Sequence, residues 1–148
     1  MIFHTKPADF NPRFEVVSCF FEYAGTFLML HRQAWKPQGN TWGLPAGKVD
    51  SGETKEEAIA REMEEEIGYR CDPKEFIFRH TVYVKYDAYD FVYHIYSLTI
   101  DERPDLVINE EEHKSHRWVT PREALEMDLI EDEAPCIHLF YNLESVAQ

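Results

Sequence analysis

Residues 54–68 constrain the fold most, because they hold helix start and stop signals on either side of an amphipathic run. Thr54 and Glu57 fit a capping box at the start, and Gly68 fits a C-terminal cap. At ~100° per residue, one apolar stripe faces the same way: Ile59, Ala60, Met63 and Ile67. The sequence therefore predicts a helix from about Lys55 to Ile67 with this stripe against a core.

Three carboxylates lie beside that stripe, because Glu62, Glu65 and Glu66 fall within a ~100° arc of the helix. Like charges three and four residues apart repel by roughly 0.2–0.5 kcal/mol per pair, and a helix C-terminus disfavours anions. A hard cation such as Mg²⁺ or Mn²⁺ would remove the conflict. The cluster alone is equally compatible with a solvated acidic face, and Arg61 with a surface ion pair to Glu57.

Strand and loop patterns precede this helix. A turn at Ala24-Gly25 separates two apolar segments, residues 15–23 and 26–32, and this arrangement predicts a hairpin. Residues 33–53 hold most of the glycines and several prolines, so they predict a long loop. A loop of this length inside a compact domain is usually functional.

The second half of the chain adds strands and two more helices. In residues 76–86, Phe78 and the other even-numbered apolar residues predict a strand with one buried face. Residues 91–100 are apolar on both faces, which is typical of a central strand. The remaining segments predict a charged loop at 101–115, a strand at 116–120, a helix at 121–127 and a helix at about 133–146. We expect one α/β (α+β) domain over residues 1–148, with helices on the faces of a mixed sheet.

Charge, hydropathy and cysteine spacing argue against a nucleic-acid-binding, secreted, membrane-spanning or disulfide-stabilised protein. The net charge of −13 is unfavourable for binding a nucleic-acid backbone, although a bound cation would still permit a phosphate substrate. The N-terminus lacks a signal-peptide pattern, and no apolar run approaches the ~18 residues that cross a membrane. Cys19, Cys71 and Cys136 are too scattered for a disulfide framework or a CxxC zinc site, so we expect a cytoplasmic protein.

Residues 47–69 carry the most specific pattern in the chain. Gly47 and Glu53 precede the run Arg61-Glu62-Met63-Glu64-Glu65-Glu66-Ile67-Gly68-Tyr69. This spacing resembles the Nudix box, Gly-x5-Glu-x7-Arg-Glu-U-x-Glu-Glu-x-Gly-U, in which U is a bulky apolar residue. Every fixed position is present, and Tyr69 stands where the last apolar residue is usually aliphatic.

The resemblance implies a Nudix-type α/β/α sandwich with a loop–helix–loop site for Mg²⁺ or Mn²⁺. The implied ligands are oxygen donors: Glu62, Glu65, Glu66 and the backbone carbonyl of Ala46. It also implies that Glu53 has a structural or metal-assisting role and that Arg61 orients a catalytic glutamate. In some relatives a further carboxylate stands six residues before a tryptophan, where this chain has Glu112, with Glu111 as the fallback. Either Glu62 or Glu112 would then be the general base.

The resemblance further implies hydrolysis of a diphosphate bond in a nucleoside diphosphate linked to another moiety. Nucleoside or deoxynucleoside triphosphates and dinucleoside polyphosphates fit equally well, ahead of nucleotide sugars and RNA 5′ ends. Candidate substrate contacts are Arg32 and Lys36 for phosphates, Trp35 for stacking on a base, and Tyr86. The place of Tyr86 after the box resembles a marker of dinucleoside-polyphosphate hydrolases, although other tyrosines crowd this region.

Several alternatives remain at this point. We expect a small-molecule nucleotide partner, no nucleic-acid or membrane partner, and a monomer or homodimer. The rival function is a non-catalytic module of the same fold that senses nucleotides or binds a protein. Glu112, His113 and His116 also permit a transition-metal site, although such histidines are more often ordinary loop residues.

Overall fold

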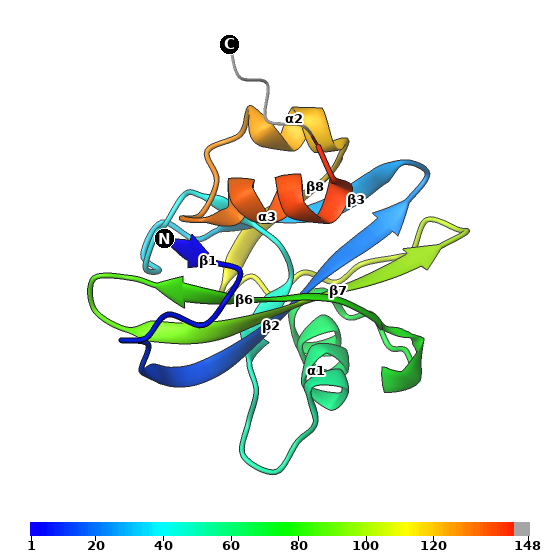
Figure 1. Cartoon of the computed structure of the whole chain (residues 1–148). Coiled ribbons are helices and arrows are strands. Elements are labelled where there is room, and N and C mark those ends of the chain that lie inside the picture. Colours follow the sequence, from blue (N-terminus) through cyan, green and yellow to red (C-terminus); the bar gives the residue numbers. More distant parts are fainter. Residues whose placement is uncertain (144–148) are drawn as a thin grey trace.

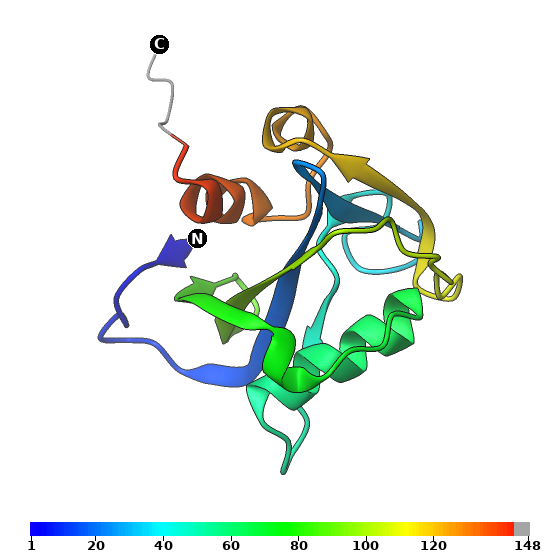
Figure 2. The ribbon, with the colours of Figure 1, turned by 90° about the vertical axis from the view of Figure 1, so that its right-hand side faces the viewer.

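A mixed sheet separates one helix from the other two in the computed structural model, which describes residues 1–143 (Figure 1). Helix α1 (Lys55–Ile67) covers one face of the sheet. Helices α2 (Pro121–Leu125) and α3 (Glu133–Tyr141) cover the other face, as the view turned by 90° also shows (Figure 2). This arrangement is the α/β/α sandwich predicted from the sequence.

Strand β2 (Pro12–Tyr23) organises the sheet. It runs parallel to β7 (Asp90–Ile100) along its whole length, and its end forms an antiparallel hairpin with β3 (Thr26–Arg32). The other strands are β1 (Ile2–Phe3), β4 (Trp42–Gly43), β5 (Ala46–Lys48), β6 (Ile77–Lys85) and β8 (His113–Val119). The order is β1-β6-β7-β2-β3-β4, with β5 paired to β2 and β8 to β3. The predicted hairpin is confirmed, and β7 is central as expected.

Helix α1 has the predicted ends. The Thr54 hydroxyl accepts the Glu57 N–H at 3.1 Å, and the Glu57 carboxylate accepts the Thr54 N–H at 2.8 Å. Gly68 adopts a left-handed conformation with φ 69° at the C-cap, where a residue without Cβ is least strained. Ile59, Met63 and Ile67 are fully buried as predicted, the half-buried Ala60 packs against the same core, and Ala58 joins the buried face.

Two predictions about strands were wrong in part. Phe78 is 50% exposed, because a β-bulge between Phe78 and His80 breaks the alternation that a regular strand would keep. Strand β8 begins at His113 rather than at residue 116, since Arg32 of β3 pairs with His113 and extends the ladder.

Loop and helix boundaries differ as well. The predicted loop at 33–53 contains the short strands β4 and β5, which attach it to the sheet. Helix α2 ends at Leu125, and a 3₁₀ turn, η1 (Pro73–Glu75), follows α1. Helix α3 ends at Tyr141, where Asn142 takes a left-handed conformation at the C-cap, so the predicted extension toward residue 146 was wrong at residues 142 and 143. Residues 144–146 of that prediction lie outside the described part of the chain.

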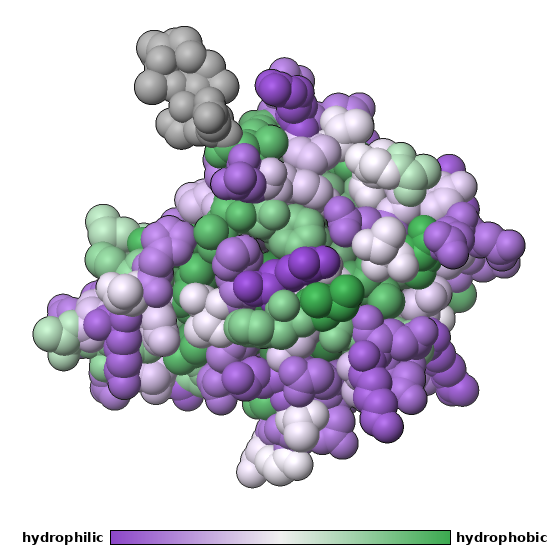
Figure 3. Space-filling model, turned by 45° about the vertical axis from the view of Figure 1, so that its right-hand side comes forward, coloured by the Kyte–Doolittle hydropathy of each residue, from purple (hydrophilic) through white to green (hydrophobic). Residues whose placement is uncertain are grey.

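Apolar side chains fill both spaces between the sheet and the helices. One core lies against α1 and a second lies against α2 and α3, where Phe20 stacks on Phe140 with ring centroids 4.2 Å apart. On the face drawn in Figure 3, hydrophobic residues reach the surface across the middle and hydrophilic residues crowd the lower right. Among residues 1–143, no helix has the length and apolar character needed to cross a bilayer.

Candidate active site

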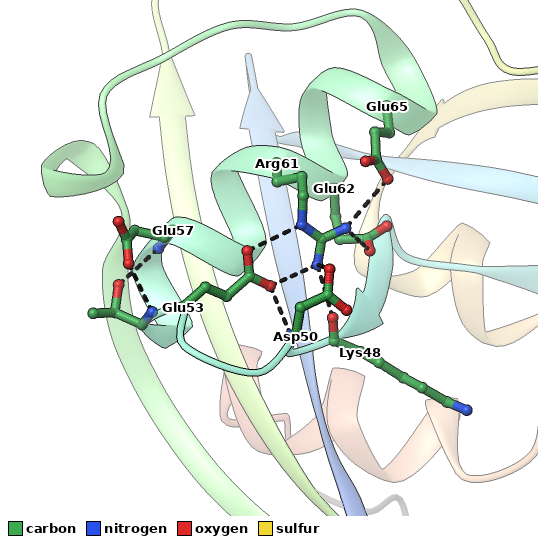
Figure 4. Close-up of polar contacts among 8 residues, drawn as sticks. Lys48, Asp50, Glu53, Glu57, Arg61, Glu62 and Glu65 are labelled. Atoms are coloured by element: carbon green, nitrogen blue, oxygen red, sulfur yellow. Dashed lines mark hydrogen bonds and ion pairs between the residues drawn. The ribbon is translucent and has the colours of Figure 1, made fainter.

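Arg61 is the centre of the polar contacts made by residues 47–69 (Figure 4). Its guanidinium donates to both Glu53 oxygens, at 2.7 and 3.1 Å, and to the Lys48 carbonyl at 2.9 Å. It also reaches Glu62 at 2.8 Å and Glu65 at 3.2 Å. The hydrogen bond to Glu53 raises the pKa of Arg61 and lowers that of Glu53. Glu57 caps the helix instead, so the alternative of a surface pair between Glu57 and Arg61 was wrong.

Glu62 packs directly over the backbone of Gly47. A Cβ at Gly47 would lie 2.0 Å from the Glu62 carboxyl carbon, a distance that no real contact tolerates. Glycine therefore gives the carboxylate its place between β5 and α1. Burial raises the pKa of Glu62 to about 7, against the opposing effect of its hydrogen bond to Arg61, and the charges of Glu65 and Glu112 add to the rise.

Glu66 lies deeper than the other carboxylates of α1, with 4% of the residue exposed. Its Oε1 accepts the Ala46 N–H at 2.8 Å. Burial raises its pKa well above the usual range, and the charges of Glu62 and Glu112 add to this effect. Its Oε2 lies 3.9 Å from Nδ1 of His113, which has no hydrogen-bond partner within residues 1–143. Because burial lowers the pKa of His113 to about 4, this histidine is neutral and the contact is no ion pair.

The chemistry of these donors fits a hard divalent cation. The charge of Glu112 raises the pKa of both Glu62 and Glu66, and the charge of Glu62 raises that of Glu66 further; a bound cation would relieve this repulsion. The arrangement is not a finished ligand shell. Among the described residues, no three His, Cys, Asp or Glu side chains form a ready-made cation site. Glu65 is 55% exposed and bound to Arg61, and Glu112 is bound to Lys36 at 3.1 Å.

A cleft of about 300 Å³ opens beside Glu66. Arg32, Ala46, Glu66 and His113 line one part of it. Aromatic side chains line another part: Phe14 of β2, Tyr86 and Tyr89 of the β6–β7 turn, and Phe91 and Tyr93 of β7. A third group includes Leu44 and Glu133, which are joined by a hydrogen bond from the Leu44 N–H to Glu133 Oε1 at 3.1 Å.

The predicted substrate contacts divide into two pairs. Arg32 and Tyr86 line the cleft, and the Tyr86 hydroxyl donates to the Glu131 carbonyl at 3.1 Å. Trp35 and Lys36 do not line the cleft. Trp35 is 69% exposed, and the Lys36 ammonium lies 5.7 Å from the Trp35 ring centroid. The structure therefore brings only the first pair together with Glu66.

Two of the cleft residues that were not predicted as substrate contacts are buried and ionisable, namely Glu133 and His113. Glu133 looks in the sequence like an ordinary acidic residue in the first turn of a helix, which is a favourable position for any carboxylate. The sequence predicted His113 only as part of a possible transition-metal site. Its burial depends on the pairing of β8 with β3 at Arg32, which is a long-range contact that no local pattern indicates. Neither carries a local pattern that distinguishes it from surface residues.

Comparison with known proteins decides the family. The model of the NUDIX domain matches residues 12–140 of the chain. The chain belongs to the Nudix family. This Nudix hydrolase is therefore an enzyme that acts on phosphoanhydride bonds.

Relatives with stated activities cover most of the Nudix hydrolase. A CTP pyrophosphohydrolase of Escherichia coli K12 is 27% identical over 133 residues, which are 88% of this chain and 93% of the relative. A putative 8-oxo-dGTP diphosphatase 3 of Mycobacterium tuberculosis is 32% identical over 104 residues, which are 69% of this chain but 48% of that longer protein.

Solved structures agree on the fold. The Nudix hydrolase RenU of M. smegmatis superposes with a TM-score of 0.72 at 25% identity, covering 90% of this chain and 86% of that one. A MutT protein of Methanosarcina mazei superposes with a TM-score of 0.77 at 22% identity, covering 89% and 95%, and this likeness concerns the fold alone.

Proposed function

We propose that this Nudix hydrolase converts nucleoside or deoxynucleoside triphosphates into nucleoside monophosphate and pyrophosphate, with Mg²⁺ or Mn²⁺ as cofactor. The observation that carries the proposal is one cleft that joins Glu66 and Arg32 to an aromatic compartment. A triphosphate chain needs the first part and a single base needs the second. A dinucleoside polyphosphate would need a further site for its second base, so we place it behind the triphosphates.

The arginine and the glutamates of the box that lie near the cleft have distinct roles in this reaction. Arg61 holds Oε1 of Glu62 and joins it to Glu53 and the Lys48 carbonyl, so it fixes α1 against the loop. A divalent cation bound through Glu62, Glu65, Glu66 and the Ala46 carbonyl would neutralise charge on the phosphoryl oxygens and acidify a water. Arg32 on the cleft wall would pair with a phosphate oxygen.

The bond changes follow from water as nucleophile. A water oxygen bonds to the α- or the β-phosphorus while the P–O bond from that phosphorus to the bridging oxygen between them breaks. The electron pair leaves with pyrophosphate in the first case and with the nucleoside monophosphate in the second. We assign the water's proton to Glu62, because burial raises its pKa to about 7, which suits a general base near neutral pH. The Glu112 side chain is more exposed, at 39% against 12% for Glu62.

The names of the relatives support this substrate class. The E. coli relative named CTP pyrophosphohydrolase matches nearly the whole of both chains, and the M. tuberculosis relative is named for 8-oxo-dGTP. Both names specify a nucleoside triphosphate with a single base.

A product screen tests the proposal. The protein is incubated with ribo- and deoxyribonucleoside triphosphates, diadenosine tetraphosphate and a nucleotide sugar, each with MgCl₂, MnCl₂ or a chelator, and products are separated by ion-exchange chromatography. Monophosphate and pyrophosphate in equal amounts, formed only with metal, support the proposal. If diadenosine tetraphosphate is hydrolysed to ATP and AMP faster than any triphosphate, dinucleoside polyphosphates replace triphosphates as the proposed substrates. Binding of nucleotides without turnover would favour the non-catalytic sensing module.

A further inference from the structure

Glu133 is a buried carboxyl group that the proposed chemistry does not use. It begins α3 and lines the cleft, with 4% of the residue exposed. Its Oε1 accepts the Leu44 N–H, whereas Oε2 has no hydrogen-bond partner among residues 1–143. A buried polar atom without a partner destabilises the fold, and more so when it is charged.

A purely structural role does not account for this group. An acid in the first turn of a helix stabilises it equally well from the surface, where the carboxylate remains hydrated. The bond to Leu44 needs one acceptor oxygen, which a buried glutamine would also supply. The second oxygen of Glu133 has a use only if something else in the cleft donates to it.

Among the described residues near Glu133, no positively charged side chain donates a hydrogen bond to its free oxygen. The titratable groups whose charges interact with Glu133 are the Tyr93 hydroxyl of β7 and the Cys136 thiol of α3, whereas the Asp132 carboxylate is bound to the N-terminal ammonium of Met1 at 2.8 Å. Burial raises the pKa of Tyr93 and of Cys136, so both stay neutral near pH 7. The aromatic compartment adjoins the same space, with the Tyr86 and Phe91 ring centroids 5.2 Å apart. A flat ring with an N–H donor on its edge complements this environment.

We propose that Glu133 reads the nucleobase, and that its free oxygen accepts a hydrogen bond from an exocyclic amino group. Cytosine and adenine are then preferred over uracil and hypoxanthine, which present a keto oxygen at the corresponding position. An oxygen opposite a carboxylate oxygen leaves two acceptors facing each other in a dry site, which is the costlier mismatch. The inference rests on the proposed function, because the aromatic compartment must hold the base.

Binding of monophosphates without divalent cation tests the inference independently of turnover. Dissociation constants of CMP, UMP, AMP and IMP are measured by calorimetry at pH 8, where the carboxylate is ionised. We expect CMP to bind about tenfold more tightly than UMP, and AMP about tenfold more tightly than IMP, which is the ratio for a ~1.4 kcal/mol difference. Equal affinities, or a preference for the keto bases, would overturn the inference.

Two variants locate the preference in one side chain. Glu133→Leu should bring both ratios close to one, and Glu133→Gln should remove their dependence on pH, since an amide does not titrate. In the wild type the amino preference should fall as pH drops below 7, because the protonated acid can also donate to a keto oxygen. If Glu133→Leu does not fold, Glu133→Gln and the pH series decide. Glu133→Gln ratios that equal those of the wild type and keep the same dependence on pH would contradict the inference.

The matched control is Glu22→Gln, which alters a carboxylate bound to Tyr141 and Thr99 and away from the cleft lining. It should reproduce the wild-type ratios. Failure of the proposed function and of this inference remain distinguishable. If no triphosphate is hydrolysed but CMP still binds more tightly than UMP, only the proposed function fails. If all triphosphates are hydrolysed but binding shows no preference for amino bases, only the role of Glu133 in base recognition fails.

Discussion

Glu66 and Glu133 are two buried glutamates that the same short segment holds in the same way. The Ala46 N–H donates to Glu66 and the Leu44 N–H to Glu133, and each residue is 4% exposed. Their neighbours differ. The like charges of Glu62 and Glu112 act on Glu66 and add to the effect of burial on its pKa. No like charge contributes to the pKa of Glu133, which burial raises to about 7 against the opposing effect of the hydrogen bond from Leu44.

The difference shows what each carboxylate needs. A cluster of like charges is satisfied by a cation, which all members share. For a single buried carboxyl group, a neutral N–H donor or protonation removes the free-energy cost of burying an unpaired charge. On the proposed function, the cleft has one part suited to phosphates with metal and another suited to a base, and five variants separate the two.

Glu66→Gln should have the largest effect. The amide keeps an acceptor for the Ala46 N–H but loses the charge that binds metal, so we expect kcat to fall by about 10³-fold, in the range seen when one charged catalytic group is removed. Steady-state kinetics with saturating Mg²⁺ measures the loss, and circular dichroism confirms that the variant folds. Turnover near the wild-type rate would refute the assigned role, and Glu22→Gln is the control.

Glu133→Gln should change how stability depends on pH. A carboxyl whose folded pKa is raised to about 7 contributes stability that is fully present below its unfolded pKa of ~4.5 and is lost as pH rises through 7. At ~1.4 kcal/mol per pKa unit, the wild type should lose roughly 3 kcal/mol more than the variant between pH 4.5 and 8. Urea denaturation across this range gives both curves. Parallel curves would contradict the raised pKa.

Gly47→Ala should disturb the phosphate part of the cleft alone. The added Cβ would displace the Glu62 carboxylate, at a cost of about 1–3 kcal/mol typical of overpacking, and kcat should fall about tenfold. Thermal unfolding and kinetics measure the two effects. Gly25→Ala is the control: its φ of 77° strains any side chain, but a Cβ there meets nothing within 4 Å. It should lose stability and keep kcat, and an equal loss of kcat would show that the Gly47 effect is indirect.

The carboxylate cluster of α1, which we propose to bind metal and phosphates, was predictable because it is local. The capping box, the Gly68 cap and the spacing of the glutamates all lie within residues 54–68, where helix geometry alone fixes their relative positions. The parallel pairing of β2 with β7 was not predicted from any one segment, and it depends on residues about 80 positions apart. The bulge at residues 78–80 likewise follows from pairing rather than from the periodic pattern.

The aromatic part of the cleft, which we propose to bind the base, could not be derived from the sequence, because it too depends on long-range pairing. Its walls come from β2, β6, β7, the segment at 43–44 and α3, which only the finished sheet brings together. The substrate contacts proposed from the sequence illustrate the limit. Arg32 and Tyr86 reached the cleft and Trp35 did not, although Trp35 was the more attractive candidate for stacking.

Trp35→Ala should therefore have the smallest effect and sharpen the contrast with Tyr86. Trp35 is 69% exposed and outside the cleft lining, so its removal should change kcat/KM for a triphosphate by less than about twofold, a surface substitution of within ~0.5 kcal/mol. Tyr86→Ala removes part of the aromatic wall and should raise KM several-fold at nearly constant kcat, which is the signature of lost binding shared by substrate and transition state. The two variants are measured on the same substrate. A larger loss of kcat/KM for Trp35→Ala than for Tyr86→Ala would mean that the loop at 33–41 closes over the bound base and that Trp35 belongs to the wall of the cleft.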